Sequence, residues 1–258
     1  MPVDNQLYNR LGDTWWQEDS LLSLLRTSIN PARFGYMRRV LTETLGIDPQ
    51  GLAVLDVGCG GGLLAEEFAR LGCRVTGVDP SAESLETARG HARAGGLEIE
   101  YVEGTGEQLP FPDAAFDAVY CCDVLEHVDD LQRTLDESAR VLKPGGVYMY
   151  DTINRTRRSR LVLINLMQEW RSTALMEPNL HDWDMFIKPS DLESALRKAG
   201  LENRDLVGIG PRGNPIGMIR DLRKRARGHM TFGEFGKRNV MRETRDTSLS
   251  YAGHALKR

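Results

Sequence analysis

Short apolar runs of strand length recur along the first 150 residues, and segments with a helical period of apolar positions separate them. Helical periods fill residues 63–71, 81–94 and 131–142, where apolar side chains recur every three to four positions. Strands that alternate with helices in this way are typical of a parallel, doubly wound α/β sheet. We expect strands over Leu52–Val57, Arg74–Val78, Ile99–Glu103, Phe116–Cys121 and Val147–Tyr150.

The pattern is less regular on either side of these strands. Residues 1–48 predict helices, one of which starts at Pro31, and Pro189–Ala199 predicts a capped helix. Residues 212–240 carry many glycines and arginines, and beyond the fifth strand we expect only Ser248–Ala255 to form a strand. We expect one domain over residues 1–258, composed of a helical cap (1–48), a core (49–154) and a substrate-facing and membrane-facing region with closing strands (155–258).

Composition places the chain among globular proteins with one large core. It has 258 residues, of which 41% are hydrophobic and 27% charged. Its four cysteines lack the CxxC spacing of metal or redox motifs, so we expect free thiols in a reducing cytoplasm. We expect no signal peptide at the N-terminus, and the apolar stretch Leu161–Met167 is too short to cross a bilayer.

The net charge of −4 hides an asymmetry between the two parts of the chain. Residues 1–154 carry 12 Lys and Arg against 25 Asp and Glu, whereas residues 155–258 carry 21 against 12. A basic C-terminal part indicates an anionic partner, and a solvated basic face without a partner is the alternative.

A glycine-rich loop follows the first expected strand and indicates a nucleoside cofactor. Gly60 to Ala65 fits the GxGxxA pattern of a dinucleotide site, with the pyrophosphate at a helix N-terminus. The alternation of Gly58, Gly60 and Gly62 after Asp56 fits S-adenosylmethionine instead, because glycines let the backbone approach the ligand and Asp56 can bind its ammonium group. Asp79 ends the second strand and would accept hydrogen bonds from ribose hydroxyls in either case.

Four later motifs favour S-adenosylmethionine. The motifs are Glu107–Phe111, Phe116–Val119, Asp123–Val128 and Val141–Gly146. The first of them begins a loop that, with Gly106, could cover an adenine. This succession resembles the class I S-adenosylmethionine methyltransferases, which implies a Rossmann-like sheet with an insertion after strand five. A dehydrogenase is the weaker alternative.

Motifs outside the core narrow the resemblance further. The segments Tyr8–Leu11, Trp15-Trp16, Ile29–Arg33, Thr152–Arg155, His181–Trp183 and Phe186–Pro189 resemble the UbiG-type O-methyltransferases of ubiquinone biosynthesis. The resemblance implies methyl transfer to a phenol or catechol hydroxyl of a polyprenylated quinone precursor that is similar to 3-demethylubiquinol. It also implies cofactor contacts at Arg33, Gly58, Asp79 and Cys122.

Some members of this family hold a divalent metal such as Mg²⁺, and the resemblance places it at Asp123, Glu126 and His127. Positions i, i+3 and i+4 share one helix face, so these side chains could converge on an ion that favours the phenolate. The family usually has Glu at the position of Asp123. In the wider superfamily, a Glu-His pair after the fourth strand is also common in proteins that bind no metal there. If the metal is needed, chelation should abolish turnover.

Three residues are candidates for proton transfer, namely Glu126, His127 and His181. His181 lies next to aromatic residues, so a packed histidine without a catalytic role is the alternative reading. Trp15 and Trp16 either line the substrate pocket or dock the N-terminal helices onto the core.

The basic part of the chain indicates a membrane surface. Arginines between 155 and 160 precede the apolar stretch Leu161–Met167, as in helices that lie on anionic lipid, so we expect a peripheral position on the inner membrane face. A second cluster, between Arg220 and Arg227, has no clear counterpart in the family. We expect no nucleic-acid partner, because no base-stacking motif accompanies the charge. A methyltransferase of soluble secondary metabolites and a non-catalytic cofactor-binding scaffold are the alternative functions, and the sequence predicts no particular oligomer.

Overall fold

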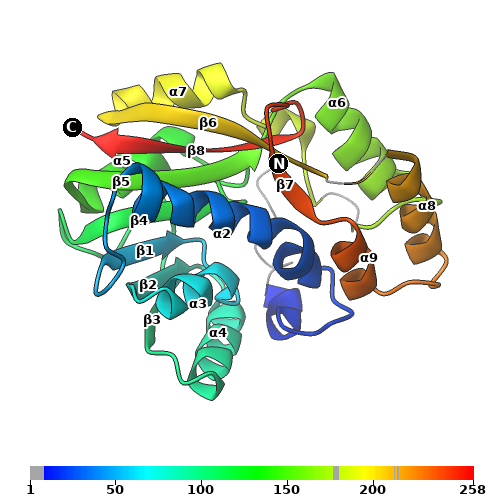
Figure 1. The fold of residues 1–258 in the computed structure, drawn as a ribbon, viewed down its shortest axis with the longest axis horizontal. Helices are drawn as coiled ribbons and strands as arrows, with labels where there is room; N and C mark the ends of the chain where they lie inside the picture. Colours follow the sequence, from blue (N-terminus) through cyan, green and yellow to red (C-terminus); the bar gives the residue numbers. More distant parts are fainter. Residues whose placement is uncertain (1–8, 177–179, 212, 214) are drawn as a thin grey trace.

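The computed structural model describes residues 9–176, 180–211, 213 and 215–258, which form an eight-stranded sheet flanked by helices (Figure 1). The strand order is β3-β2-β1-β4-β5-β8-β6-β7. The five strands expected from the apolar runs form the parallel part of the sheet. They are β1 (Ala53–Val57), β2 (Arg74–Asp79), β3 (Ile99–Glu103), β4 (Phe116–Cys122) and β5 (Leu142–Ile153).

The doubly wound parallel part of the sheet is as expected, and three antiparallel strands extend the sheet beyond β5. β8 (Ser250–Lys257), which the sequence predicts within one or two residues, runs antiparallel to β5. β6 (Leu201–Pro211) and β7 (Met241–Thr244) extend the antiparallel part and were not expected. A run of polar residues, Glu202–Asp205, interrupts β6, and β7 has only four residues, so neither strand shows a clean alternation of apolar and polar positions.

The helices of the core match the periodic segments of the sequence. They are α3 (Leu63–Arg70), α4 (Ala82–Ala94), α5 (Leu131–Val141) and α7 (Pro189–Lys198). Side-chain caps define two of the starts, because Ser81 accepts from the backbone N–H of Ser84 and Asp130 from that of Arg133. Apolar cores fill both faces of the sheet, with Phe68 and Tyr120 on one face and Leu55 and Leu135 on the other.

Before the sheet, the described part of the helical cap comprises η1 (Gly12–Thr14), η2 (Leu25–Ile29), α2 (Asn30–Arg39) and η3 (Val40–Thr44). After β5 come α6 (Arg157–Ser159), the π-helical segment η4 (Arg160–Glu169) and η5 (Trp183–Met185). Among the described residues, no helix is both long and apolar enough to span a bilayer.

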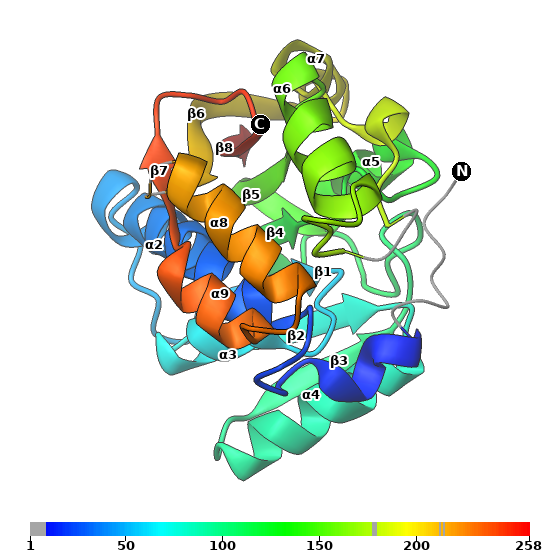
Figure 2. The same ribbon diagram turned by 90° about the vertical axis from the view of Figure 1, so that its right-hand side faces the viewer.

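The glycine- and arginine-rich segment is helical, although no helix was predicted there. Its described residues form α8 (Pro215–Ala226) and α9 (Phe232–Arg238), which lie side by side and lead into the start of β7 (Figure 2). A capping box starts α9, since Thr231 accepts from the N–H of Glu234 and Glu234 accepts from that of Thr231.

Candidate active site

A cavity of about 820 Å³ opens at the carboxyl ends of the parallel strands. Asp56 and Gly58 reach it from the end of β1, Asp79 from β2 and Cys122 from β4. The chain reverses its direction of travel across the sheet between β1 and β4, and open α/β sheets bind ligands at such a switch point. The fold thus gathers residues that are far apart in the sequence into one site.

The glycine loop after β1 is closely packed from both sides. Gly58, Gly60 and Gly62 all have positive φ, between 50° and 79°. A Cβ on Gly58 would lie 2.3 Å from a Val124 methyl group, and one on Gly62 would lie 2.3 Å from the Tyr101 hydroxyl. The loop therefore favours glycine at these positions, and Gly58 and Gly60 line the cavity.

Asp79 is held in place by the same loop. Its carboxylate accepts from the N–H of Gly60 at 2.8 Å and from the N–H of Ser81 at 2.9 Å. Burial raises the pKa of Asp79, and burial also raises the pKa of neighbouring Asp56, to about 8. Two buried acids at the strand ends favour a ligand that brings hydroxyl donors and a cation.

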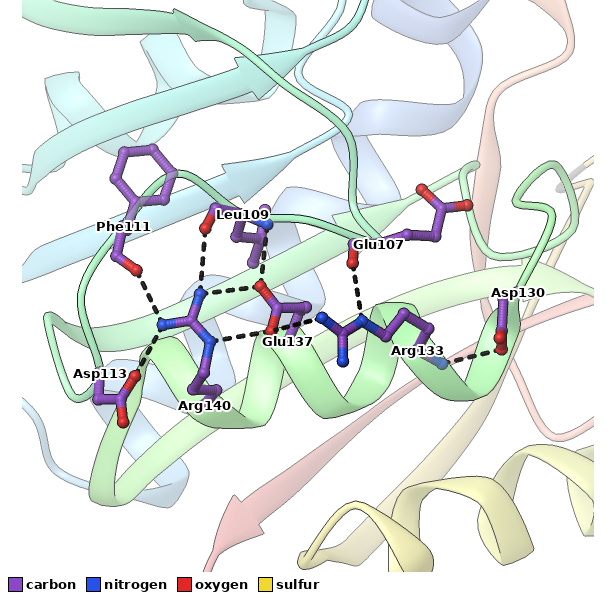
Figure 3. A network of polar contacts seen from close by, with 8 residues as sticks. All are labelled: Glu107, Leu109, Phe111, Asp113, Asp130, Arg133, Glu137 and Arg140. Carbon is purple, nitrogen blue, oxygen red and sulfur yellow. Dashed lines mark hydrogen bonds and ion pairs between the residues drawn. The ribbon is translucent and has the colours of Figure 1, made fainter.

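The loop between β3 and β4 is tied to α5 by two arginines (Figure 3). Arg140 donates to the carbonyl oxygens of Leu109 at 3.0 Å and Phe111 at 2.8 Å. Arg133 donates to the carbonyl of Glu107 at 3.1 Å, which holds this residue and Gly106 at the cavity wall. The position that the sequence assigns to an adenine-covering loop is therefore fixed by a polar network.

Trp15 lines the cavity and also docks the cap, whereas Trp16 docks the cap without lining the cavity. The Trp15 ring covers the glycine loop, where a Cβ on Gly61 would lie 2.2 Å from it, and it lines the cavity. Its Nε1 donates to Ser84 at 2.9 Å, and Nε1 of Trp16 donates to the Gly61 carbonyl at 2.9 Å.

Arg33 lines the cavity and joins two carboxylates. Its Nε donates to Asp151 Oδ2 at 2.5 Å, and its Nη2 forms an ion pair with Asp123. Burial opposes ionisation of Asp123, but the charge of Arg33 and their hydrogen bond hold the pKa of this carboxyl below its usual value. Asp123 has a φ of 54°, and its N–H donates to Asp151 at 3.0 Å.

The metal site that the sequence suggests at Asp123, Glu126 and His127 does not fit this arrangement. Residues 125–127 form a turn and not the expected helix, so the i, i+3, i+4 argument fails. Asp123 is paired with Arg33, whose fixed positive charge opposes a second cation at the same carboxylate. Glu126 is buried and accepts from Thr152 at 2.7 Å. Within the described ranges, no three His, Cys, Asp or Glu side chains are grouped to hold a metal ion.

Two histidines meet beside Asp123 at the cavity wall. The rings of His127 and His181 have centroids 5.3 Å apart and are inclined by 30°. Burial lowers the pKa of His181 to about 4 and that of His127 to about 3. Both rings are therefore neutral at pH 7. Among the residues that the structure describes, Nδ1 of His181 is buried without a hydrogen-bond partner.

Most of the residues singled out from the sequence line this one cavity, while Gly62 and Glu126 do not. Those that line it are Arg33, Asp56, Gly58, Gly60, Asp79, Gly106, Glu107, Cys122, Asp123, His127 and His181. The Cys122 thiol has its pKa raised by burial and then by the charge of Asp151, so it is neutral.

The apolar side of the cavity was not predicted from the sequence. Met167 from η4, Met218 from α8 and Phe235 from α9 line it together with Leu24 and Leu175. A periodic apolar stripe in α8 was the available signal, but the surrounding arginines obscured it. The cavity thus has a polar half at the strand ends and an apolar half under the flanking helices.

Comparison with known proteins agrees with this architecture. Residues 55–150 match the family described as "Methyltransferase domain". The chain is 38% identical over 213 residues to the ubiquinone biosynthesis O-methyltransferase of Maricaulis maris, which covers 81% of this chain and 83% of the relative. The protein of the same name from Azorhizobium caulinodans is 35% identical, again over 81% and 83% of the two chains.

Solved structures share the fold at lower sequence identity. A SAM-dependent methyltransferase from Thermotoga maritima superposes with a TM-score of 0.59 at 20% identity, over 98% of this chain and 99% of the other. At this identity, the likeness concerns the fold.

Proposed function

We infer, because the chain belongs to the S-adenosylmethionine-dependent O-methyltransferases of ubiquinone biosynthesis, that its acceptor is a phenol or catechol on a polyprenylated quinone precursor. The precursor would be similar to 3-demethylubiquinol. One observation supports this proposal above the others. A single cavity joins a polar half suited to the cofactor with an apolar half suited to a prenylated ring, and the neutral histidine pair lies on its wall.

The residues of the polar half fit a zwitterionic nucleoside cofactor. Asp79 would accept from the ribose hydroxyls, and Asp56 would bind the ammonium group. Arg33 has five N–H donors, of which the contacts with Asp151, Asp123 and Asn30 use three, so donors remain for the cofactor's carboxylate. Gly58, Gly60, Gly106, Glu107 and Cys122 would complete this half. The bound cofactor supplies an electrophilic methyl group.

His181 is the proposed proton acceptor for the phenol. Its neutral imidazole has a buried Nδ1 free of partners within the described part of the chain, and it faces the cavity. A weakly basic imidazole suffices, because the phenolic proton becomes strongly acidic as its oxygen gains the methyl group. His127 would position the ring of His181. Glu126 does not reach the cavity and is the weaker candidate.

Residues 1–258 would form one methyltransferase domain. In it, residues 49–154 hold the cofactor, and the flanking parts (1–48 and 155–258) enclose the acceptor. A soluble secondary metabolite is the second candidate acceptor, favoured by the α8–α9 segment that the family resemblance does not cover.

Methyl transfer from labelled S-adenosylmethionine to a short-chain prenylated catechol tests the acceptor. We expect labelled methyl ether from the wild type and almost none from Asp79→Asn. Binding of cofactor without transfer to any prenylated catechol would contradict the proposal and favour the soluble acceptor. If no phenol of either kind is methylated, a non-catalytic scaffold is favoured.

We also propose a peripheral position on an anionic membrane. Leu161, Trp170 and Ile216 are large apolar side chains with 48%, 49% and 80% of their surface exposed, and exposed arginines surround the first two. Apolar side chains and cations on one surface suit insertion between anionic headgroups.

Sedimentation with anionic liposomes tests this position. We expect binding that weakens with salt and falls in an Arg157→Ala/Arg160→Ala variant. The matched control, Arg197→Ala/Lys198→Ala, removes the same charge from α7, which lies at the other end of the molecule (Figure 1). Equal binding to neutral liposomes would argue against the electrostatic contribution.

A further inference from the structure

The helices α8 and α9, which we call the α8–α9 segment, are hydrogen-bonded to the N-terminal cap. The N–H of Gly233 donates to the carbonyl of Glu18 at 3.1 Å, and the N–H of Phe232 donates to Asp19 at 2.9 Å. Ser28 donates to the carbonyl of Asn239 at 2.6 Å. These contacts join parts of the chain more than 200 residues apart, so the segment has a defined place.

The α8–α9 segment completes the apolar half of the cavity. Leu222 and Phe235 are buried in one cluster with Leu24 and Leu175, and Met167 and Met218 pack against it. Met218 and Phe235 also line the cavity itself. Methionine adapts its shape to flexible apolar ligands, because it is unbranched and polarizable. The segment therefore contributes directly to ligand contact.

Polar side chains on this wall offer little to a polar ligand. The hydroxyl of Ser28 is already bonded to the Asn239 carbonyl, and the amide nitrogen of Asn239 donates to the Phe235 carbonyl at 3.0 Å. A ligand seated here gains affinity by burying apolar surface. A hydrocarbon chain fits this chemistry, and a polyhydroxylated metabolite does not.

The size of the cavity limits how much of such a chain it encloses. Cavities that bind one drug-sized ligand measure roughly 300–1,000 Å³. The present 820 Å³ must accommodate the cofactor, the acceptor ring and any enclosed part of the chain. Space for the tail is therefore restricted to its first units, and the remainder must lie outside.

We propose that Met218 and Phe235, with Met167 beside them, form a subsite for the first isoprenoid units of the acceptor and set its preference for a prenyl tail. This inference rests on the proposed function. It assigns a role to the α8–α9 segment, which forms one wall of the acceptor half of the cavity and contacts the N-terminal cap.

Acceptors that differ in their tails test the subsite. The series consists of a catechol without a tail and catechols with one and three isoprene units, each presented in detergent. For the wild type, we expect kcat/KM to rise by at least about tenfold from the tail-free acceptor to the first prenylated one, since burial of two methylene groups is worth that much. Met218→Trp, which fills the subsite, should abolish this gain, so that prenylated and tail-free acceptors react with similar kcat/KM.

Two further variants keep the test independent of misfolding. Ala226→Trp places the same indole on an exposed position of α8 and should retain the gain. Met218→Ala enlarges the subsite and should shift the preference toward bulkier tails. An unchanged tail preference in both Met218 variants would overturn the inference.

Binding of farnesol, which carries the isoprenoid chain without a phenol, separates this inference from the proposed function. We expect calorimetric binding to the wild type saturated with S-adenosylhomocysteine, and at least about tenfold weaker binding to Met218→Trp. If no catechol is methylated but farnesol binds in this Met218-dependent way, the subsite stands and the proposed acceptor fails. If catechols are methylated but Met218→Trp binds farnesol as tightly as the wild type does, the subsite is contradicted and the proposed function is not.

Discussion

Arg33 Nε donates to Asp151 Oδ2 at 2.5 Å, so a side chain of α2 is bound to the carboxyl-terminal half of β5. The same guanidinium forms an ion pair with Asp123, and all three residues lie at the wall of the cavity or directly behind it. A protein side chain, the guanidinium of Arg33, therefore supplies the positive charge beside Asp151 and Asp123. The pair connects the N-terminal cap to the sheet beside the cavity.

Replacement of Arg33 by Ala should destabilise the fold and weaken cofactor binding. Asp151 and Asp123 would lose their cation, and breaking a buried ion pair typically costs about 3–5 kcal/mol. Urea denaturation and calorimetry with S-adenosylhomocysteine measure the two effects. Arg38→Ala on the same helix removes an exposed charge and should cost less than about 1 kcal/mol. Equal stability of the two variants would contradict the role of the buried pair.

Chelation should leave methyl transfer intact, which reverses the expectation drawn from the sequence. The carboxylate of Asp123 is held by Arg33, and Glu126 accepts from Thr152 and does not line the cavity, so the three expected ligands are not gathered around one ion. Turnover after exhaustive EDTA treatment and dialysis measures this. Activity lost with EDTA and restored by Mg²⁺ would contradict this prediction and show that the reaction needs a divalent metal.

His181→Gln should lower turnover while S-adenosylhomocysteine affinity stays unchanged. Loss of a positioned base typically costs about 10²- to 10⁴-fold in rate. The pKa of His181 is lowered to about 4 by burial, so the wild-type rate should be independent of the protonation of this ring down to about pH 5. His229→Gln changes an exposed histidine and is the control. A rate that His181→Gln leaves unaltered would exclude His181 as the base.

Cofactor affinity should rise between pH 6 and pH 8. Burial raises the pKa of Asp56 to about 8, so the free protein holds a proton there at pH 6 to 7. A bound ammonium group favours the carboxylate, and binding therefore expels this proton. Calorimetric titrations with S-adenosylhomocysteine at several pH values measure the slope, which cannot exceed tenfold per pH unit for one proton. In Asp56→Asn, this pH dependence should be lost or reduced. An unaltered slope in that variant would assign the proton to another group.

Glu126→Gln should be more stable than the wild type at pH 9. Burial, followed by the charge of Asp123, raises the pKa of Glu126 to about 8, above its value of 4.5 in the unfolded chain. Wild-type stability therefore falls as the pH rises from 4.5 to 8, whereas the neutral amide escapes this loss. Urea denaturation at pH 6 and pH 9 compares the two proteins. A stability difference that does not grow with pH would mean that Glu126 is already ionised at pH 6.

The strands β1 to β5 and the helices between them follow closely from the sequence. Val54, Leu55 and Val57 are buried on both sides of β1, and this produces the continuous apolar run seen in the chain. β6 and β7 were missed because they carry polar residues on exposed positions near the edge of the sheet, where burial no longer imposes a pattern. α8 was missed because its arginines outnumber the few apolar positions that face Leu24 and Leu175.

By itself, the sequence determined the class of fold, the glycine loop with Asp56 and Asp79, and the family. All of these reside in short segments, whose apolar period or motif depends on neighbours a few residues away. The tertiary structure alone decided the partner of Asp123, which is Arg33, and the position of Met218 at the cavity. Such pairings join residues that are distant along the chain. They depend on how whole elements pack, and local periodicity carries no information about that.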